Sequence, residues 1–178
     1  METETLSKTT KNEYKVFVVE DSDVYRTLLV EFISKLKKSG DEQSPDYSIH
    51  GFSSGEECLE NLDLKPDVLI LDYHLDGYDT KSMNGLDILK TMKKLSPETE
   101  IVILSCQKRL EVMKDLLRAG ARDYINKDNI SQLKVSQLIE KLIRDKEKNK
   151  HKISRLPKAI ILLMIILAII IIVYMLTN

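Results

Sequence analysis

Short apolar runs alternate with longer segments of helical periodicity between residues 14 and 144. Five runs have the β-branched and aromatic composition of buried strands: Tyr14–Val19, Tyr47–Phe52, Val68–Leu71, Glu100–Leu104 and Asp123–Ile125. A first helix is predicted between Val24 and Leu36 by apolar residues at i, i+4, i+5 and i+8. Four more helices are predicted at Ser54–Leu62, Gly85–Leu95, Leu110–Ala119 and Ile130–Arg144. This alternation predicts an α/β protein with a doubly wound, five-stranded parallel sheet.

The last helical segment of the chain has no polar face. Residues Ala159–Leu176 form a run of 18 residues without a charge, proline or glycine. A helix of about 20 apolar residues spans the hydrocarbon core of a bilayer, which is about 30 Å thick. A fully buried core helix is the alternative, but a soluble helix of this length normally carries a polar face. We therefore expect a single transmembrane helix over residues 158–177.

The segment before this helix is basic. Residues 144–158 contain seven Lys and Arg side chains against Asp145 and Glu147. Lys and Arg beside a membrane helix favour the cytoplasmic side and attract anionic lipid headgroups. We therefore expect a single-pass, tail-anchored membrane protein whose N-terminal domain is cytoplasmic. The expected organisation is a disordered segment at 1–12, a domain at 13–145, a basic juxtamembrane linker at 146–157 and the membrane helix.

The net charge of −1 conceals two oppositely charged parts. Residues 1–143 hold 26 acidic and 20 basic side chains, whereas the remainder is basic. An acidic domain offers no basic stripe to nucleic acid phosphates, which argues against direct nucleic acid binding. Cys58 and Cys106 have neither CxxC nor metal-ligand spacing, so we expect reduced thiols.

Polar residues stand where four of the predicted strands end. Glu20 and Asp21 follow the first strand, Asp72 follows the third, Ser105 follows the fourth, and Lys127 lies just past the fifth. Ligands of open parallel sheets bind at the carboxyl ends of the strands. Three converging carboxylates repel one another unless a cation neutralises them, and oxygen ligands suit Mg²⁺. With a lysine and a hydroxyl beside them, they predict phosphoryl transfer to a carboxylate.

The segments VFVVEDS, VLILDYHL, IVILS and YINKD, in this order and spacing, resemble the receiver domain of two-component response regulators. The resemblance covers about residues 14–145. It implies that Asp72 is the phosphoacceptor and that Mg²⁺ is bound by Glu20, Asp21, Asp72 and the backbone carbonyl of His74. Ser105 would turn toward the phosphoryl group, and Lys127 would form an ion pair with it.

The resemblance also implies a switch and its partners. Tyr124 matches the aromatic residue whose rotamer changes on phosphorylation. The expected phosphoryl donor is a histidine kinase or a phosphotransfer protein, and the expected output is protein–protein interaction at the membrane. A homodimer would form through the fourth helix, fifth strand and fifth helix. No separate catalytic domain is expected.

The chain departs from the family at three places. The loop after Asp72 is long and lacks the usual Met-Pro, and His74 occupies a position from which its side chain can face the site. Asp76 and Asp79 add acidity to that loop. Asp128 follows Lys127 where the family usually has proline.

Two other functions are compatible with this pattern. A receiver-like scaffold that works without phosphate is the first alternative. A phosphatase of the haloacid dehalogenase type, with Asp72 as nucleophile, is the second. The second is disfavoured because Tyr73 and His74 follow Asp72 where a DxDx(T/V) motif is expected.

Overall fold

The computed structural model describes residues 13–39, 46–75, 83–154 and 158–177. The predicted disorder at 1–12 and the acidic positions Asp76 and Asp79 lie outside these ranges. Contacts divide the chain into two compact units, Met1–Ile143 and Arg144–Asn178.

The first unit contains a five-stranded parallel sheet in the order β2-β1-β3-β4-β5. The strands are β1 (Glu13–Val19), β2 (Asp46–Phe52), β3 (Val68–Asp72), β4 (Glu100–Ser105) and β5 (Asp123–Asn126). Each lies within one residue of its predicted bounds, and the predicted fold is confirmed. The chain order reverses between β1 and β3, so the carboxyl ends of these two strands flank the site at which such sheets bind ligands.

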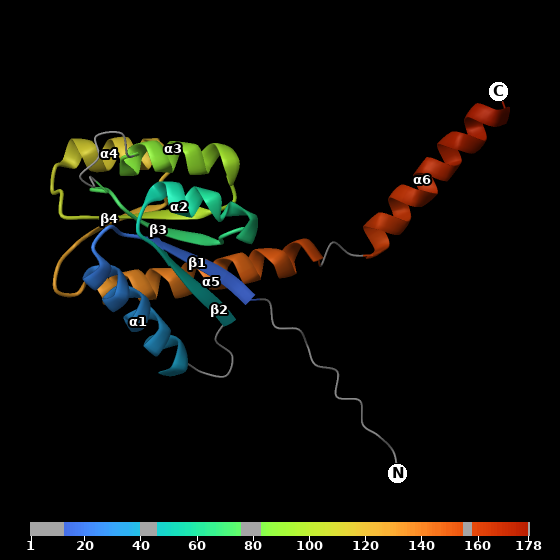
Figure 1. Ribbon diagram of the computed structural model, residues 1–178. Helices are drawn as coiled ribbons and strands as arrows, with labels where there is room; N and C mark the ends of the chain where they lie inside the picture. The colour runs from blue at the N-terminus through green and yellow to red at the C-terminus, as the bar shows by residue number, and fades with distance from the viewer. Residues whose placement is uncertain (1–12, 40–45, 76–82, 155–157, 178) are drawn as a thin grey trace, which may run out of the picture. The chain divides into compact units, whose positions relative to one another are not determined.

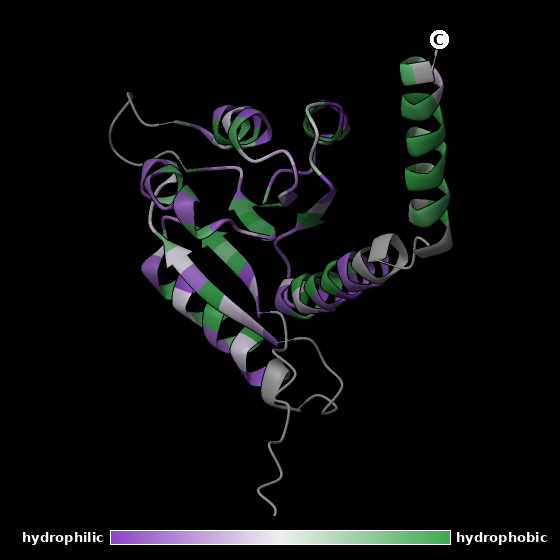
Figure 2. Cartoon of the chain, turned by 90° about the vertical axis from the view of Figure 1, so that its right-hand side faces the viewer, coloured by the Kyte–Doolittle hydropathy of each residue, from purple (hydrophilic) through white to green (hydrophobic). Residues whose placement is uncertain are grey.

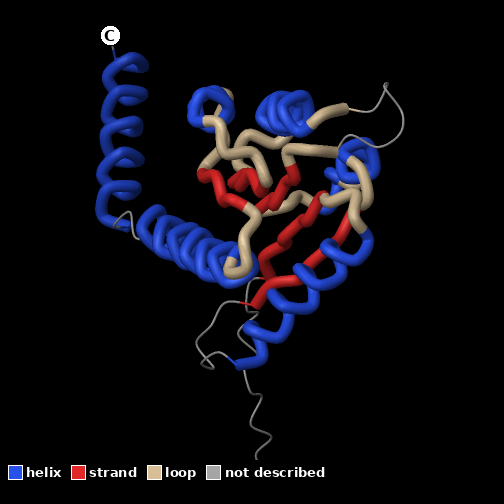
Figure 3. The backbone as a smooth tube through the Cα atoms, turned by 90° about the vertical axis from the view of Figure 1, so that its left-hand side faces the viewer, coloured by secondary structure: helices blue, strands red, loops and turns tan. Residues whose placement is uncertain are grey.

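Helices cover both faces of the sheet (Figures 1 and 3). On one face, α1 (Asp23–Ser39) and α5 (Ser131–Ser154) pack on a core that includes Val16, Val18 and Ile70. On the other face lie α2 (Gly55–Glu60), α3 (Gly85–Leu95) and α4 (Leu110–Arg118). Burial of both faces of the sheet explains the continuous apolar runs Val16–Val19 in β1 and Val68–Leu71 in β3.

Three helices differ from their predicted bounds by two residues or more, and the first is α1, which ends at Ser39, three residues past Leu36. The helix predicted at Ser54–Leu62 is divided into α2 and a short 3₁₀ turn, Leu62–Leu64, and Ser54 caps α2 by accepting a hydrogen bond from the backbone N–H of Glu57. The helix α5 continues ten residues beyond its predicted end at Arg144. The continuation, residues 145–154, contains four Lys and one Glu, which favour helix, but it has no apolar stripe from which a helix could be predicted.

The second unit contains α6 (Lys158–Thr177), which is hydrophobic along its length (Figure 2). Side chains within α6 are described at residues 160 and 162–176. Across the described part of the chain, no helix combines the length and the apolar character needed to cross a bilayer. The predicted transmembrane helix is therefore not confirmed.

Candidate phosphoacceptor site

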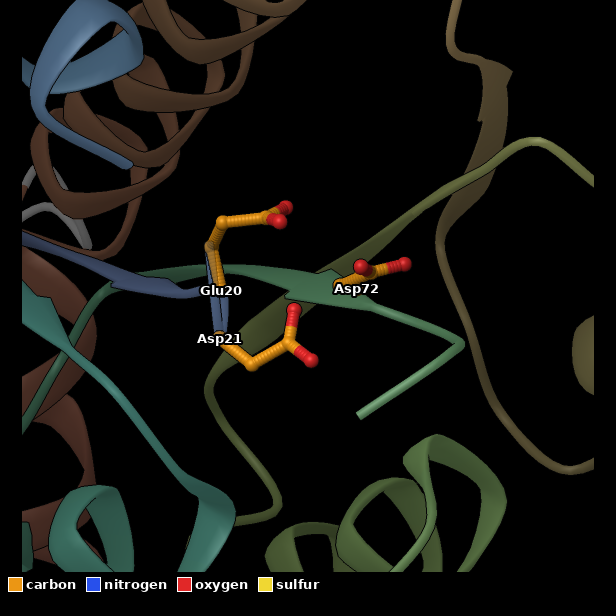
Figure 4. Close-up of side chains that lie close together, drawn as sticks. All are labelled: Glu20, Asp21 and Asp72. Carbon is orange, nitrogen blue, oxygen red and sulfur yellow. The ribbon is translucent and has the colours of Figure 1, made fainter. Parts of the chain in front are cut away.

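Three carboxylates gather at the carboxyl ends of β1 and β3 (Figure 4). Glu20, Asp21 and Asp72 each offer an oxygen, and these oxygens lie within 4.8 Å of one another. Glu20 and Asp72 are only 2% and 3% exposed, whereas Asp21 is exposed. The register that pairs Val19 with Leu71 brings the two strand ends side by side. A cluster of acidic oxygens with one open side fits a hard divalent cation such as Mg²⁺.

Lys127 bridges the two buried carboxylates. Its ammonium nitrogen lies 2.6 Å from Glu20 Oε2 and 2.7 Å from Asp72 Oδ2. Burial opposes the charge of Lys127, but the hydrogen bonds to Asp72 and Glu20 outweigh it and raise the pKa of the ammonium. Burial raises the pKa of Glu20, and repulsion from Asp72 acts in the same direction, while the hydrogen bond from Lys127 opposes both. One ammonium among three carboxylates still leaves the site with a net negative charge.

Ser105 is fully buried at the end of β4 and is held on two sides. Its hydroxyl oxygen lies 3.2 Å from His74 Nδ1 and accepts a hydrogen bond of 3.0 Å from the backbone N–H of Gln107. The backbone N–H of His74 donates a hydrogen bond of 3.1 Å to Asp72 Oδ1. His74 thus contacts both the predicted phosphoacceptor and the predicted switch hydroxyl.

Tyr124 lies on β5 and is partly buried beside the apolar residues of α4. Its hydroxyl donates a hydrogen bond to the backbone carbonyl of Gln107, two residues after Ser105. The loop that follows β4 therefore connects the hydroxyl of Ser105 to the ring of Tyr124.

The structure brings Glu20, Asp21, Asp72 and Lys127 together, with Ser105 and His74 beside them. Sequence reasoning missed two residues next to this group. Tyr25 of α1 lies against Lys127, and Ser131 of α5 bonds to Tyr25. Tyr25 and Ser131 are 106 positions apart, so no local pattern signals their contact.

An acidic cation site, a bridging lysine and a hydroxyl at the strand ends of a β2-β1-β3-β4-β5 sheet define a phosphate-accepting switch domain. Residues 16–142 match the family described as "Response regulator receiver domain". The chain belongs to this family. Receiver domains bind Mg²⁺ at an acidic pocket that corresponds here to Glu20, Asp21 and Asp72, and they interact with histidine kinases or phosphotransfer proteins.

Individual relatives agree with this assignment. The chain is 28% identical over 115 residues to the chemotaxis protein CheY of Thermotoga maritima, which covers 64% of this chain and 84% of that protein. It is 36% identical over 121 residues to protein-glutamate methylesterase/protein-glutamine glutaminase 2 of Paramagnetospirillum magneticum, with 66% of this chain and 31% of that protein covered. The crystal structure of the response regulator domain of T. maritima CheB superposes with a TM-score of 0.56 at 27% identity, over 75% of this chain and 96% of that one.

Proposed function

We propose that the chain is a membrane-anchored receiver in which Asp72 accepts a phosphoryl group from the phosphohistidine of a histidine kinase or phosphotransfer protein. One observation carries this proposal: the buried Asp72 carboxylate lies with Glu20 and Asp21 in one cluster and is bridged to Glu20 by Lys127. These groups are those that phosphoryl transfer to a carboxylate needs.

Each residue of the site has a separate role in the proposed phosphoryl transfer. Glu20, Asp21, Asp72 and the His74 carbonyl would hold Mg²⁺, which when bound neutralises phosphoryl oxygens. A carboxylate oxygen of Asp72 forms the new O–P bond as the P–N bond of the donor breaks, and the donor imidazole keeps the electron pair. Lys127 then transfers its ion pair from the Asp72 carboxylate to the phosphoryl oxygens. Ser105 exchanges its hydrogen bonds with His74 and Gln107 for one to the phosphoryl group.

The change at Ser105 reaches the surface through Gln107. Because the Tyr124 hydroxyl donates to the Gln107 carbonyl, movement of this loop changes the hydrogen bond that fixes the tyrosine ring. The output would be read on α4, β5 and α5, where Leu110, Leu117 and Leu133 are 50%, 41% and 42% exposed. This surface is the proposed site of a homodimer or of a downstream protein partner, and a phosphoryl group shifts it only through its differential interaction with the two states.

Phosphorylation is tested by intact mass. Full-length protein in mild detergent with Mg²⁺ and acetyl phosphate is expected to gain one phosphoryl group. The Asp72→Asn variant is expected to gain none, because an amide is not a nucleophile of this kind. A matched control is Asp87→Asn, in the exposed first turn of α3, which should label like the wild type. Absence of labelling in the wild type, together with no response to phosphohistidine donors, would favour the phosphate-independent scaffold.

The proposed anchor rests on the apolar surface of α6. The large apolar side chains from 162 to 176 are each between 47% and 81% exposed. A continuous apolar surface of this kind is unfavourable in water and requires a cover of lipid or protein. The basic residues between 144 and 158 supply the flank that favours anionic, cytoplasmic headgroups.

Membrane association is tested by alkaline carbonate extraction of cell membranes. The full chain is expected to remain with the membrane pellet, whereas a chain ending at Ser154 is expected in the supernatant. Both chains retain most of the basic flank, so the comparison isolates α6 from electrostatic adsorption. Release of the full chain by carbonate would contradict an integral anchor.

A further inference from the structure

We propose that Tyr25 is a positioning residue for Lys127. Its ring contacts the Lys127 ammonium, and its hydroxyl is hydrogen-bonded to Ser131, which in turn bonds to the turn that follows Lys127. The proposal concerns the same site as the proposed phosphorylation and rests on it. The ammonium of Lys127 lies 4.7 Å from the centroid of the Tyr25 ring. Such a distance lies within the range of a cation–π contact, in which the negative ring face attracts the cation.

The ring adds a third contact to the ammonium. Glu20 and Asp72 supply two oxygens, and both come from the ends of sheet strands. Tyr25 comes from the first turns of α1 and contacts the ammonium through its ring. The lysine side chain is only 14% exposed, so water competes little with the ring, and a cation–π contact is stronger when desolvated.

The tyrosine hydroxyl is fixed by a buried serine. Tyr25 Oη lies 2.9 Å from Ser131 Oγ, and Ser131 is fully buried at the start of α5. The hydroxyl of Ser131 donates to the Asp128 carbonyl at 2.9 Å. Since its hydrogen is used there, Ser131 is the acceptor and Tyr25 is the donor in the bond between them.

Asp128 closes the connection back to Lys127. The Asp128 carboxylate accepts a bond of 3.0 Å from the Ile130 N–H and one of 2.6 Å from the Lys134 ammonium. The Asp128 carbonyl accepts the Ser131 N–H at 3.1 Å as well as its hydroxyl. These bonds fix the turn that immediately follows Lys127, in a position where this chain has no proline ring to restrict the backbone.

Tyr25 therefore contacts Lys127 directly and is also connected to the turn that carries its backbone. A lysine side chain has four flexible carbons, and ordering it opposes any reaction that needs its ammonium in one place. A lysine that is ordered before phosphoryl transfer avoids that cost during the reaction. The ring and the bond to Ser131 thus have separable effects, which substitutions can distinguish.

The test measures the rate of aspartyl phosphate formation from acetyl phosphate in the full-length protein, as a function of Mg²⁺. Tyr25→Leu removes the ring, and about a tenfold lower rate at saturating Mg²⁺ is expected. Tyr25→Phe keeps the ring and loses only the bond to Ser131, so its rate should stay within about threefold of the wild type. The half-saturating Mg²⁺ concentration should change by less than about twofold, because Tyr25 does not supply a metal ligand.

A double-mutant cycle tests the hydroxyl. Tyr25→Phe and Ser131→Ala remove the same hydrogen bond from opposite sides, so the double variant should be no slower than the slower single variant. Additive losses would mean that the two residues act separately and would overturn the connection. This cycle remains informative if Tyr25→Leu fails to fold.

The outcomes separate this inference from the function on which it rests. If the wild type forms no aspartyl phosphate from either acetyl phosphate or a phosphohistidine donor, the proposed function fails. If the wild type is labelled and Tyr25→Leu reacts equally fast, the positioning role is overturned while the function stands. A rate for Tyr25→Phe as low as that for Tyr25→Leu would overturn the role of the ring. Weaker Mg²⁺ binding in parallel with the lower rate would indicate general loosening of the site and would also overturn the inference.

Discussion

Replacing Lys127 by methionine is expected to lower the free energy of unfolding by about 3 kcal/mol at pH 7 in the absence of divalent cations. Methionine fills a similar volume but leaves Glu20 and Asp72 without their shared cation. Both carboxylates are nearly inaccessible to water, so the loss is larger than for a surface ion pair. Urea unfolding of the full-length protein in mild detergent, followed by the tyrosine signal, measures the difference.

Magnesium and pH should change the stability deficit of Lys127→Met, which is its loss in free energy of unfolding relative to the wild type, in predictable directions. Millimolar Mg²⁺ is expected to recover part of it, because a cation held by the three carboxylates replaces the lost charge. The pKa of Lys127 is raised, so its contribution is fully present below its ordinary pKa of 10.5 and is lost only as the pH rises through the higher folded value. The deficit should therefore be constant between pH 7 and pH 9.

Acidification should make the deficit smaller. The pKa of Glu20 is already raised above its ordinary value of 4.5 by burial, and loss of the Lys127 hydrogen bond raises it further. The folded variant then takes up a proton more readily than the folded wild type, so its relative stability increases as the pH falls. A control is the double variant Lys127→Met, Asp72→Asn. It leaves only one buried carboxylate, Glu20, without a neutralising cation, so it should lose less stability than Lys127→Met alone. A deficit that grows on acidification would contradict this electrostatic account.

The same substitution should slow aspartyl phosphate formation by about a hundredfold at saturating Mg²⁺, more than Tyr25→Leu does, because it removes the ammonium itself and not only its support. The effect is smaller than complete loss because the metal ion neutralises most of the phosphoryl charge. An unchanged rate would mean that Lys127 acts only in the stability of the site.

The strands and the acidic cluster were predictable from the sequence for definite physical reasons. Parallel strands covered on both faces read as continuous apolar runs, and the carboxyl ends of neighbouring strands meet at one edge. Glu20, Asp21 and Asp72 could therefore be grouped before the structure was known. The apolar periodicity did not fix where α5 ends, because a helix that leaves the core needs no apolar stripe, although the basic composition after Arg144 is compatible with a helical linker.

The support of Lys127 by Tyr25 was not predictable for a different reason. Tyr25 lies in the first turn of the helix that follows Glu20. The apolar spacing of that helix predicts core residues, so a tyrosine at this position would be interpreted as a packing residue. Its bond to Ser131 depends on how α1 and α5 pack on the same face of the sheet. Contacts between side chains on separate helices depend on packing geometry that local spacing does not specify.

The second large effect is expected at Gly85, the first residue of α3, because its backbone lies against the end of β3. A Cβ atom at Gly85 would stand 2.7 Å from Tyr73 Cα and 2.8 Å and 2.9 Å from the carbonyl oxygens of Asp72 and Tyr73. These neighbours are backbone atoms, so the strand end or the helix must move. We expect Gly85→Ala to lower the free energy of unfolding by about 3 kcal/mol.

Gly55→Ala is the matched control, since Gly55 is the first residue of α2 and its added Cβ would meet only the side chain of Ile88. Ile88 is fully buried and β-branched, and its Cδ1 and Cγ1 would clash with the new Cβ, so a comparable cost of about 3 kcal/mol is expected without movement of β3. Only Gly85→Ala should also slow phosphoryl transfer, because displacing the end of β3 moves the Asp72 carboxylate away from Lys127 and Glu20. Equal losses of stability with unchanged rates in both variants would show that the close approach at Gly85 affects packing alone and does not fix the position of the phosphoacceptor.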